Sequence, residues 1–372
     1  MCIPSLTIEQ LETLKTYKYE STNKSIAFNY IIGPILNQCA KFLPCSIPPL
    51  LLNFLALVFN IIPLIIINNQ VFNDFSENLE KHICIIFAIF HFLYIIVDNY
   101  NSVQSKYPGY TPYHMLVGHW CNVFIIIILS YNLSHLFQTG NEGPFSVMFF
   151  IGLMLGYYAS AYEEFALGEL HLSYFNAANE GNLLIVFFAL IGGIFGSKRF
   201  TYEIWDLTVG EWIGLFTLIA SVHIAIMSLI NIYFGKGMKR VLSTLVDWFC
   251  FYNVFIVPFV MSEKDDVLLY DNFWLIMLSI CLLFARNATD LQVKIFTKQQ
   301  SSLGIMVIVL NALMPISFFI RKKKIILSIY TICSIGFATE MGMLFVIRSI
   351  EIMTYLKTNF LCIPKTQVES PC

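Results

Sequence analysis

The sequence predicts an all-α, polytopic membrane protein with about ten transmembrane helices, and composition and hydropathy are the main evidence. Hydrophobic residues make up 57% of the 372-residue chain and charged residues only 12%, whereas soluble domains carry about twice that share of charge. Mean hydropathy is +0.70. Apolar runs close to the roughly 20 residues that a membrane-crossing helix needs recur along the chain. Because backbone groups in lipid need internal hydrogen-bond partners, we expect each run to be helical.

The apolar runs give the expected helices in order. They cover residues 50–67, 83–98, 116–137, 145–160, 182–196, 211–234, 241–262, 268–285, 303–320 and 325–347. The run 182–196 is the least regular, because Gly192, Gly193 and Gly196 interrupt it. Glycines in a membrane helix allow a neighbouring helix to approach closely, so we expect this run to span as well.

Three regions follow from these runs. In the N-terminal segment, residues 1–47, Ile8, Leu11 and Leu14 recur every third residue. This spacing predicts one or two amphipathic helices lying on the membrane. Residues 48–350 are expected to form the transmembrane helical domain, and residues 351–372 a C-terminal tail.

The distribution of positive charge predicts the orientation. Ten spans place both termini on one side, and 14 of the 22 lysines and arginines fall on that side. Positive charge favours the cytoplasmic side of a membrane, so we expect cytoplasmic or matrix termini. The basic cluster at residues 321–324 lies on the other side and opposes this bias.

Net charge and cysteine usage exclude other classes. The formal net charge is −2, so there is no basic patch of the kind that nucleic-acid binding requires. The ten cysteines include no CxxC pair, and many lie in apolar runs. We interpret them as small hydrophobic residues rather than as disulfides or metal ligands.

Three stretches carry a resemblance to one family. They are LTIEQLETLKTYKYESTNKS (6–25), LPCSIPPLLLNFLALVFNIIP (43–63) and AYEEFALGELHLSYFNAANEGNLLIV (161–186). They resemble the CDP-alcohol phosphotransferases, in the choline/ethanolamine branch. The third stretch is the most specific. Its matches to the family's loop are Glu163, Glu164, Asn176, Glu180 and Gly181.

The resemblance implies a reaction and a metal site. In this family, a CDP-alcohol and diacylglycerol give a phospholipid and CMP. The family motif, D-x2-D-G-x2-A-R-x8-G-x3-D-x3-D, supplies four carboxylates that hold two divalent cations against the diphosphate. Oxygen ligands of this kind suit Mg²⁺ or Mn²⁺. The cations neutralise the transferring phosphate, and the last Asp can accept the proton of the lipid hydroxyl.

The metal-binding positions are largely replaced in this sequence. Asp98 matches the second Asp of the motif, and Ile95 stands at the first. A two-residue insertion places Gly118 and Asn122 at the last two positions. Without an insertion, the last two Asp positions of the motif are occupied by Leu116 and Trp120. Under either register, three of the four aspartates are absent. We therefore expect no cofactor, with Asp98 as the remaining ligand for Mg²⁺ or Mn²⁺ if the chain is active.

Other residues are weaker candidates for a site. Besides Asp98, the ligand-binding candidates are Glu163, Glu164, Asn176 and Glu180. The matched glutamates lie outside the family's metal site, which favours structural roles for them. A zinc site made of His114, His119 and Cys121 is disfavoured, because these residues do not all share one helix face.

The sequence leaves several functions open. The leading hypothesis is a catalytically inactive homologue that acts as a structural or lipid-binding subunit, with membrane lipids and other membrane-protein subunits as partners. The alternative is an active enzyme of phospholipid synthesis with a rearranged metal site. A transporter or scramblase is disfavoured, because the sequence indicates no paired intramembrane charges. The resemblance implies that the protein is located in the endoplasmic reticulum membrane. The alternative location, for a repurposed subunit, is the mitochondrial inner membrane.

Overall fold

A computed structural model describes residues 5–17, 21–39, 47–73, 77–104, 111–139, 144–248, 266–298 and 323–357. Within these residues, eight helices are long and apolar enough to cross a membrane. Their bounds are α3 (Pro49–Asn73), α4 (Glu77–Gln104), α5 (Pro112–Leu136), α6 (Pro144–Leu167), α7 (Asn182–Phe195), α8 (Val209–Lys236), α10 (Asp266–Thr297) and α12 (Lys323–Leu356). They confirm eight of the ten expected spans, including 182–196, and they confirm the predicted fold class. The expected span 303–320 and most of 241–262 lie outside the described residues, although residues 238–248 are helical.

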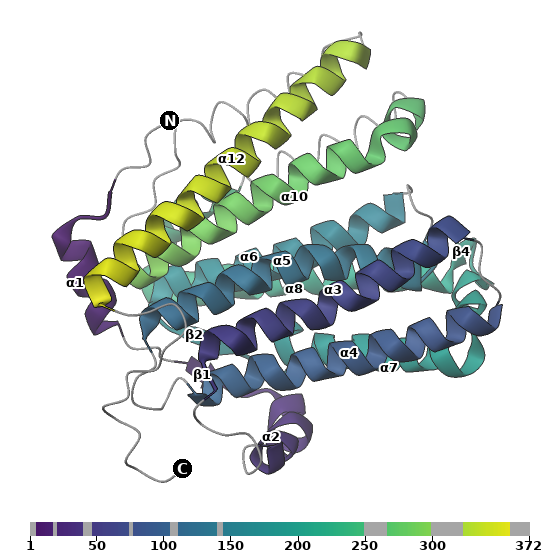
Figure 1. Cartoon of the computed structure of the whole chain (residues 1–372), viewed down its shortest axis with the longest axis horizontal. Helices are drawn as coiled ribbons and strands as arrows, with labels where there is room; N and C mark the ends of the chain where they lie inside the picture. Colours follow the sequence, from purple (N-terminus) through teal and green to yellow (C-terminus); the bar gives the residue numbers. More distant parts are fainter. Residues whose placement is uncertain are drawn as a thin grey trace.

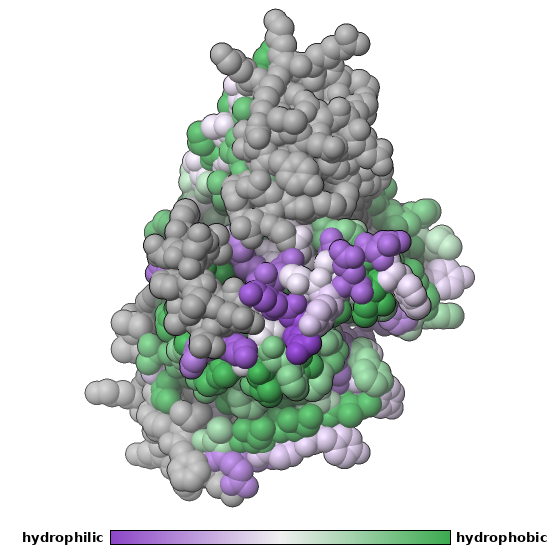
Figure 2. Space-filling model, turned by 90° about the vertical axis from the view of Figure 1, so that its right-hand side faces the viewer, coloured by the Kyte–Doolittle hydropathy of each residue, from purple (hydrophilic) through white to green (hydrophobic). Residues whose placement is uncertain are grey.

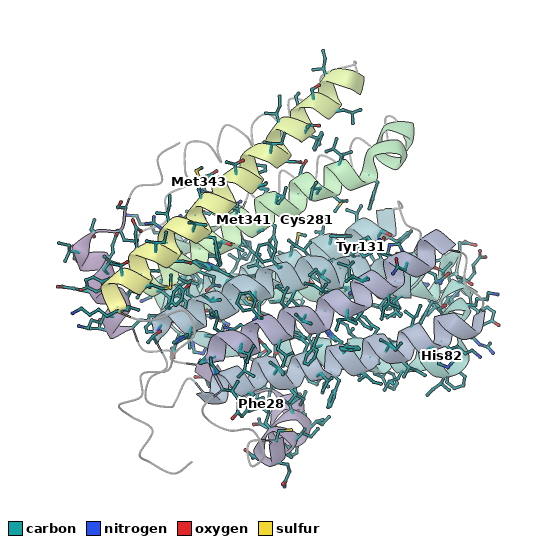
Figure 3. All side chains as sticks on the ribbon, in the orientation of Figure 1. Phe28, His82, Tyr131, Cys281, Met341 and Met343 are labelled. Carbon is teal, nitrogen blue, oxygen red and sulfur yellow. The ribbon has the colours of Figure 1, made fainter. Side chains whose placement is uncertain are left out.

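The described helices pack around α5, which contributes to two hydrophobic cores (Figure 1). The N-terminal half of α5 packs with α6, α10 and α12, and Leu116 and Trp120 lie in that core. The C-terminal half packs with α3, and its Leu129 and Leu133 lie in the second core, which also contains residues of α4 and α7. Cys281 on α10 and Met341 on α12 belong to the first core (Figure 3). This arrangement makes α5 the central helix of the described bundle.

Five cysteines fall in the described residues, and none of the five forms a disulfide. Four of them, Cys84, Cys121, Cys281 and Cys333, are buried inside membrane-spanning helices. Their burial agrees with packing roles for these four residues.

The N-terminal helix α1 (Ile8–Thr16) docks on the ends of α10 and α12. It begins with a capping box, in which Thr7 Oγ1 accepts from the Gln10 amide and Gln10 Oε1 accepts from the Thr7 amide. Leu14 is fully buried, whereas Ile8 is 72% exposed. The predicted apolar face is therefore only partly covered by the protein. A second short helical segment follows, made of η1 (Phe28–Ile32) and α2 (Gly33–Cys39).

The glycines of α7 allow the close helix contact that the sequence predicts. A Cβ atom added at Gly193 would lie 2.5 Å from Cγ1 of Ile85 on α4. At Gly192, an added Cβ would lie 3.2 Å from the sulfur of Cys84, also on α4. A larger side chain would push the two helices apart, so these glycines set the distance between α4 and α7.

Two small sheets lie at opposite ends of the bundle. Strand β1 (Ser21–Asn23) pairs in parallel with β2 (Leu170–Leu172) near the α1 end, and β3 (Glu203–Ile204) pairs antiparallel with β4 (Leu207–Thr208). Figure 3 shows Phe28 toward one end and His82 toward the other. The end that carries β3 and β4 faces the viewer in Figure 2, where hydrophilic residues gather at the centre and hydrophobic residues cover much of the flanks. This pattern agrees with helices that cross a membrane between polar ends.

Candidate functional site

Helices α4 and α5 bring together the two polar residues at the resemblance-derived metal positions. The side-chain amide of Asn122 donates from Nδ2 to Oδ1 of Asp98 over 3.1 Å. Both side chains are partly buried. Asp98 lies near the C-terminal end of α4, and Asn122 lies in the third turn of α5, which begins at Pro112 after the N-cap Thr111. Helices α4 and α5 therefore place the two residues opposite each other.

The structure favours the register with the insertion on α5. Leu116 and Trp120, which strict spacing assigns to the site, face α10 instead. Leu116 is fully buried in the core shared with α10, and Trp120 Nε1 donates to the carbonyl oxygen of Thr289 on α10 over 3.4 Å. Gly118 and Asn122 are one helical turn apart and contact α3 and α4. Sequence spacing alone left both registers open, because helix-face contacts decide between them.

Gly118 lies against an asparagine of α3 rather than against an acid. A Cβ atom added at Gly118 would lie 3.1 Å from Oδ1 and 3.3 Å from Nδ2 of Asn53. Asn53 is 4% exposed, and its Nδ2 donates to the carbonyl oxygen of His114 over 3.1 Å. Ile95, one turn before Asp98, is 1% exposed and lies in the second core. The motif positions and the residue that fills the space beside Gly118 therefore supply the amides of Asn122 and Asn53 and the alkyl side chain of Ile95.

These residues do not fit the two divalent cations of the resembled family. Among the described residues, no group of three or more His, Cys, Asp or Glu side chains is placed to hold a metal ion. Asp98 supplies one carboxylate, and one of its oxygens already accepts from Asn122. The alternative zinc ligands are also dispersed: His114 Nδ1 lies 3.0 Å from Thr111 Oγ1 at the start of α5, and the His119 ring packs on Phe296.

A chain of polar contacts joins this region to α6 and α10. Tyr157 on α6 donates its hydroxyl proton to the carbonyl oxygen of His119 over 3.3 Å, and Gln292 on α10 donates to the Tyr157 hydroxyl over 3.4 Å. Two turns further along α6, Glu164 accepts from the Tyr17 hydroxyl over 3.4 Å. Glu164 therefore bonds to the segment just after α1, and not to the Asp98–Asn122 pair.

The remaining glutamate candidates make contacts that hold elements together. Glu163 is buried and accepts from Asn231 Nδ2 on α8 over 2.8 Å. Glu180 accepts from the hydroxyl of Ser25 at 2.7 Å, the amide of Ala27 at 2.9 Å and the amide of Asn176 at 3.0 Å. In these contacts, both glutamates link separate elements of the fold.

Asn176 has a local role in the same loop. It is the N-cap of the short helix η2 (Ala177–Gly181), and its Oδ1 accepts from the amide of Asn179 over 2.9 Å. Glu180 accepts from the Asn176 amide within the same turn and from the Ser25 hydroxyl, so it stabilises the turn and links it to the N-terminal segment.

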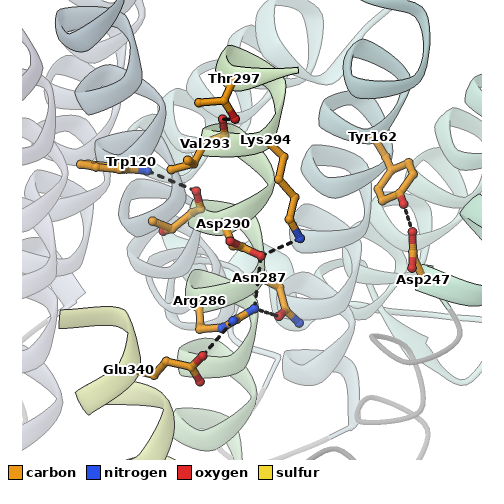
Figure 4. A network of polar contacts seen from close by, with 11 residues as sticks. Trp120, Tyr162, Asp247, Arg286, Asn287, Asp290, Val293, Lys294, Thr297 and Glu340 are labelled. Carbon is orange, nitrogen blue, oxygen red and sulfur yellow. Dashed lines mark hydrogen bonds and ion pairs between the residues drawn. The ribbon is translucent and has the colours of Figure 1, made fainter. Parts of the chain in front are cut away.

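A network of charged side chains inside the membrane spans was not predicted from the sequence. Arg286 on α10 forms an ion pair with Glu340 on α12 at 2.8 Å and with Asp290 at 3.5 Å (Figure 4). Lys294, one turn after Asp290, pairs with it at 2.8 Å. Arg286 and Glu340 are 5% and 8% exposed. The expectation that the spans lack paired charges is therefore wrong.

The error came from the predicted end of one span. The apolar run ends at residue 285, whereas the spanning part of α10 continues to Thr297 and includes Arg286, Asp290 and Lys294. Their i, i+4, i+8 spacing was a signal for one polar stripe on a continuing helix. Arg286, Lys294 and Arg348 of α12 were counted among the positive charges on the side of the termini. Because they lie within spans, the charge bias that predicts the orientation is weaker than expected.

Comparison with known proteins finds relatives of similar sequence. No family model matches the chain. The CDP-alcohol phosphatidyltransferase class-I family protein 3 of Dictyostelium discoideum is 25% identical over 195 residues, which are 52% of this chain and 48% of the relative. Family protein 2 of the same organism is 26% identical over 239 residues, or 62% and 57% of the two chains.

A named phosphotransferase is also similar. Choline/ethanolaminephosphotransferase 1 of Saccharomyces cerevisiae is 23% identical over 208 residues, which are 54% of this chain and 51% of the relative. The chain spans about half the length of the curated relatives it matches. Together with the membrane-spanning helices, these similarities support a relationship to the CDP-alcohol phosphotransferases and to their choline/ethanolamine branch.

Proposed function

We propose that this chain is a catalytically inactive homologue of the choline/ethanolamine phosphotransferases that acts as a structural or lipid-binding subunit in a membrane. One observation carries the proposal. At the four positions where the resembled family places metal-binding aspartates, the chain has Ile95, Asp98, Gly118 and Asn122, and the Asp98 carboxylate accepts a hydrogen bond from the Asn122 amide.

The chemistry of phosphoryl transfer explains why this replacement matters. Mg²⁺ requires near-octahedral oxygen ligands, and carboxylates supply both ligands and compensating charge. With one carboxylate in place of four, two adjacent cations lack the negative charge that stabilises them. Asn122 also cannot accept a proton as a carboxylate does, so the position resembling the general base has lost that capacity. Loss of metal ligands and of the base removes the two main contributions to catalysis together.

An assay with the purified chain tests the catalytic part of the proposal. The chain in lipid nanodiscs would receive CDP-choline or CDP-ethanolamine, diacylglycerol, and Mg²⁺ or Mn²⁺. We expect no phospholipid product above the level of an Asp98→Ala variant. The yeast choline/ethanolaminephosphotransferase is the positive control under the same conditions. Product formation that Asp98→Ala abolishes would overturn the proposal and support an active enzyme with a rearranged metal site.

Native membranes test the subunit role. We propose the endoplasmic reticulum as the location, by similarity to the family, with the mitochondrial inner membrane as the alternative for a repurposed subunit. Affinity purification of the tagged full chain in mild detergent is expected to recover a defined membrane-protein partner or tightly bound phospholipid, identified by mass spectrometry. A monodisperse chain that carries neither would contradict this role.

A further inference from the structure

We propose that asparagine side chains have replaced divalent cations as the groups that hold α3, α4 and α5 together at the candidate site. The inference rests on the proposed function, because it assigns a role to the residues that stand at the former metal positions. It states that this region of the bundle is held by amide hydrogen bonds and does not depend on Mg²⁺ or Mn²⁺.

The first contact joins α4 to α5. Asn122 Nδ2 lies 3.1 Å from Asp98 Oδ1, so the positive end of an amide dipole faces the carboxylate. A carboxylate at position 122 would instead place two negative charges at this distance, and such a pair requires a proton or a cation between them. The amide at position 122 therefore removes the need for a cation between the two helices.

The second contact joins α3 to α5. Asn53 Nδ2 donates to the carbonyl oxygen of His114, and the same amide occupies the space beside Gly118. An added Cβ at Gly118 would lie 3.1 Å from Asn53 Oδ1, which is closer than an ordinary van der Waals contact. An aspartate at position 118 would have to displace this amide. The glycine thus makes room for a hydrogen-bonding group from α3 where the resembled family has a metal ligand.

The two contacts share α5 as their common helix. Asn122 and Gly118 are one turn apart on it, and their partners come from two different helices. Both contacts are at least partly buried, so water competes weakly for their hydrogen bonds. We infer that Asn53 and Asn122 are positioning residues, which keep the three helices in the arrangement that cations would otherwise stabilise.

Thermal unfolding with and without cations tests this inference on the full chain in nanodiscs. The Tm of the wild type is expected to be the same in EDTA, Mg²⁺ and Mn²⁺. Asn122→Asp is expected to lower the Tm in EDTA by several degrees and to regain much of that loss in Mn²⁺. Mn²⁺ binding, measured by electron paramagnetic resonance, is expected for Asn122→Asp and not for the wild type.

A matched control uses the same substitution elsewhere. Asn68 on α3 accepts a hydrogen bond from the Tyr131 hydroxyl on α5 over 3.1 Å, away from Asp98. Asn68→Asp is expected to show no response of Tm to Mn²⁺. If Asn122→Asp fails to fold, Asn122→Leu replaces it. That variant is expected to be less stable than the wild type by the same amount in EDTA and in Mn²⁺.

Two results would overturn the inference. One is a wild-type Tm that rises with Mg²⁺ or Mn²⁺ and loses this response in Asp98→Ala. The other is an Asn122→Asp variant that folds with unchanged Tm and binds no Mn²⁺. The outcomes separate this inference from the proposed function. Product formation with a cation-independent Tm overturns only the function, and a cation-raised Tm without product overturns only the inference.

Discussion

At the scale of single residues, the membrane interior contains charges that are stable because they are paired. Arg286 and Glu340 come from different helices and are each less than 10% exposed. A charge in the bilayer interior is costly unless another charge compensates it. A buried pair adds little net stability over apolar residues of similar volume, whereas removing one partner leaves an uncompensated charge. Substitution of one residue of the pair is therefore expected to be tolerated only when its partner is substituted as well.

This pairing predicts a non-additive effect of substitutions. Arg286→Met leaves Glu340 without its cation and is expected to destabilise the chain by about 3–5 kcal/mol. The double variant Arg286→Met/Glu340→Leu is expected to recover most of that loss, because both buried charges are then removed. Thermal unfolding of detergent-solubilised protein, followed by size-exclusion chromatography, measures both. A double variant no more stable than the single one would show that the pair itself stabilises the fold.

At the scale of elements, α4 is held to its neighbours by both small and polar residues. On one side, Gly192 and Gly193 of α7 let the two backbones approach. Further along α4, the buried His91 ring lies between two amides, with Nδ1 3.4 Å from Asn60 Oδ1 on α3 and Nε2 3.2 Å from Asn182 Oδ1 at the start of α7. Close packing and interhelical hydrogen bonds are the main forces between helices in lipid.

A pair of alanine substitutions tests the packing contribution. Gly193→Ala places a methyl group 2.5 Å from Ile85 Cγ1 and is expected to cost roughly 1–3 kcal/mol through overpacking. Gly342→Ala on α12 is the matched control, since an added Cβ there meets no atom within 4 Å. It is expected to stabilise the helix by up to about 1 kcal/mol. Equal Tm shifts for both variants would argue against a close α4–α7 contact as the cause.

At the scale of the whole molecule, the spanning region begins and ends at the same end of the bundle, although α10 and α12 run parallel to each other. Helix α12 ends at the end of the bundle where α3 begins, whereas the β3–β4 hairpin lies at the opposite end (Figure 1). Both ends of the spanning region therefore lie on one side of the membrane. Because the charge bias is weaker than predicted, an experiment decides which side of the membrane holds these two ends.

A topology assay tests this arrangement. A protease site introduced at the hairpin, beside the exposed Trp205, and a tag at the C-terminus are expected to be accessible from opposite sides of sealed microsomes. We expect the tag to be accessible from the cytoplasmic side. The side of the termini still holds more of the lysines and arginines outside the spans, and positive charge favours the cytoplasmic side. Accessibility of both positions from one side would contradict the placement of the hairpin and the end of α12 at opposite ends of the bundle.

Much of the fold follows from sequence because its cause is local. An apolar run of sufficient length in lipid must be helical to satisfy its own backbone, so eight of the predicted runs appear as spanning helices. The end of α10 was missed because polar residues at i, i+4 and i+8 ended the apolar run before the helix ended. The short strands β1 and β2 were missed because their pairing joins residues about 150 positions apart.

The sequence by itself determined the membrane class, the family resemblance and the shortage of acids around Asp98, since each is a property of residue identity and order. Only the tertiary structure decided which face of α5 meets α4, and so that Asn122 rather than Trp120 contacts Asp98. It also decided that Arg286 meets Glu340. The physical reason is the same in both cases: the rotation of one helix against another is set by the packing of side chains from several helices at once.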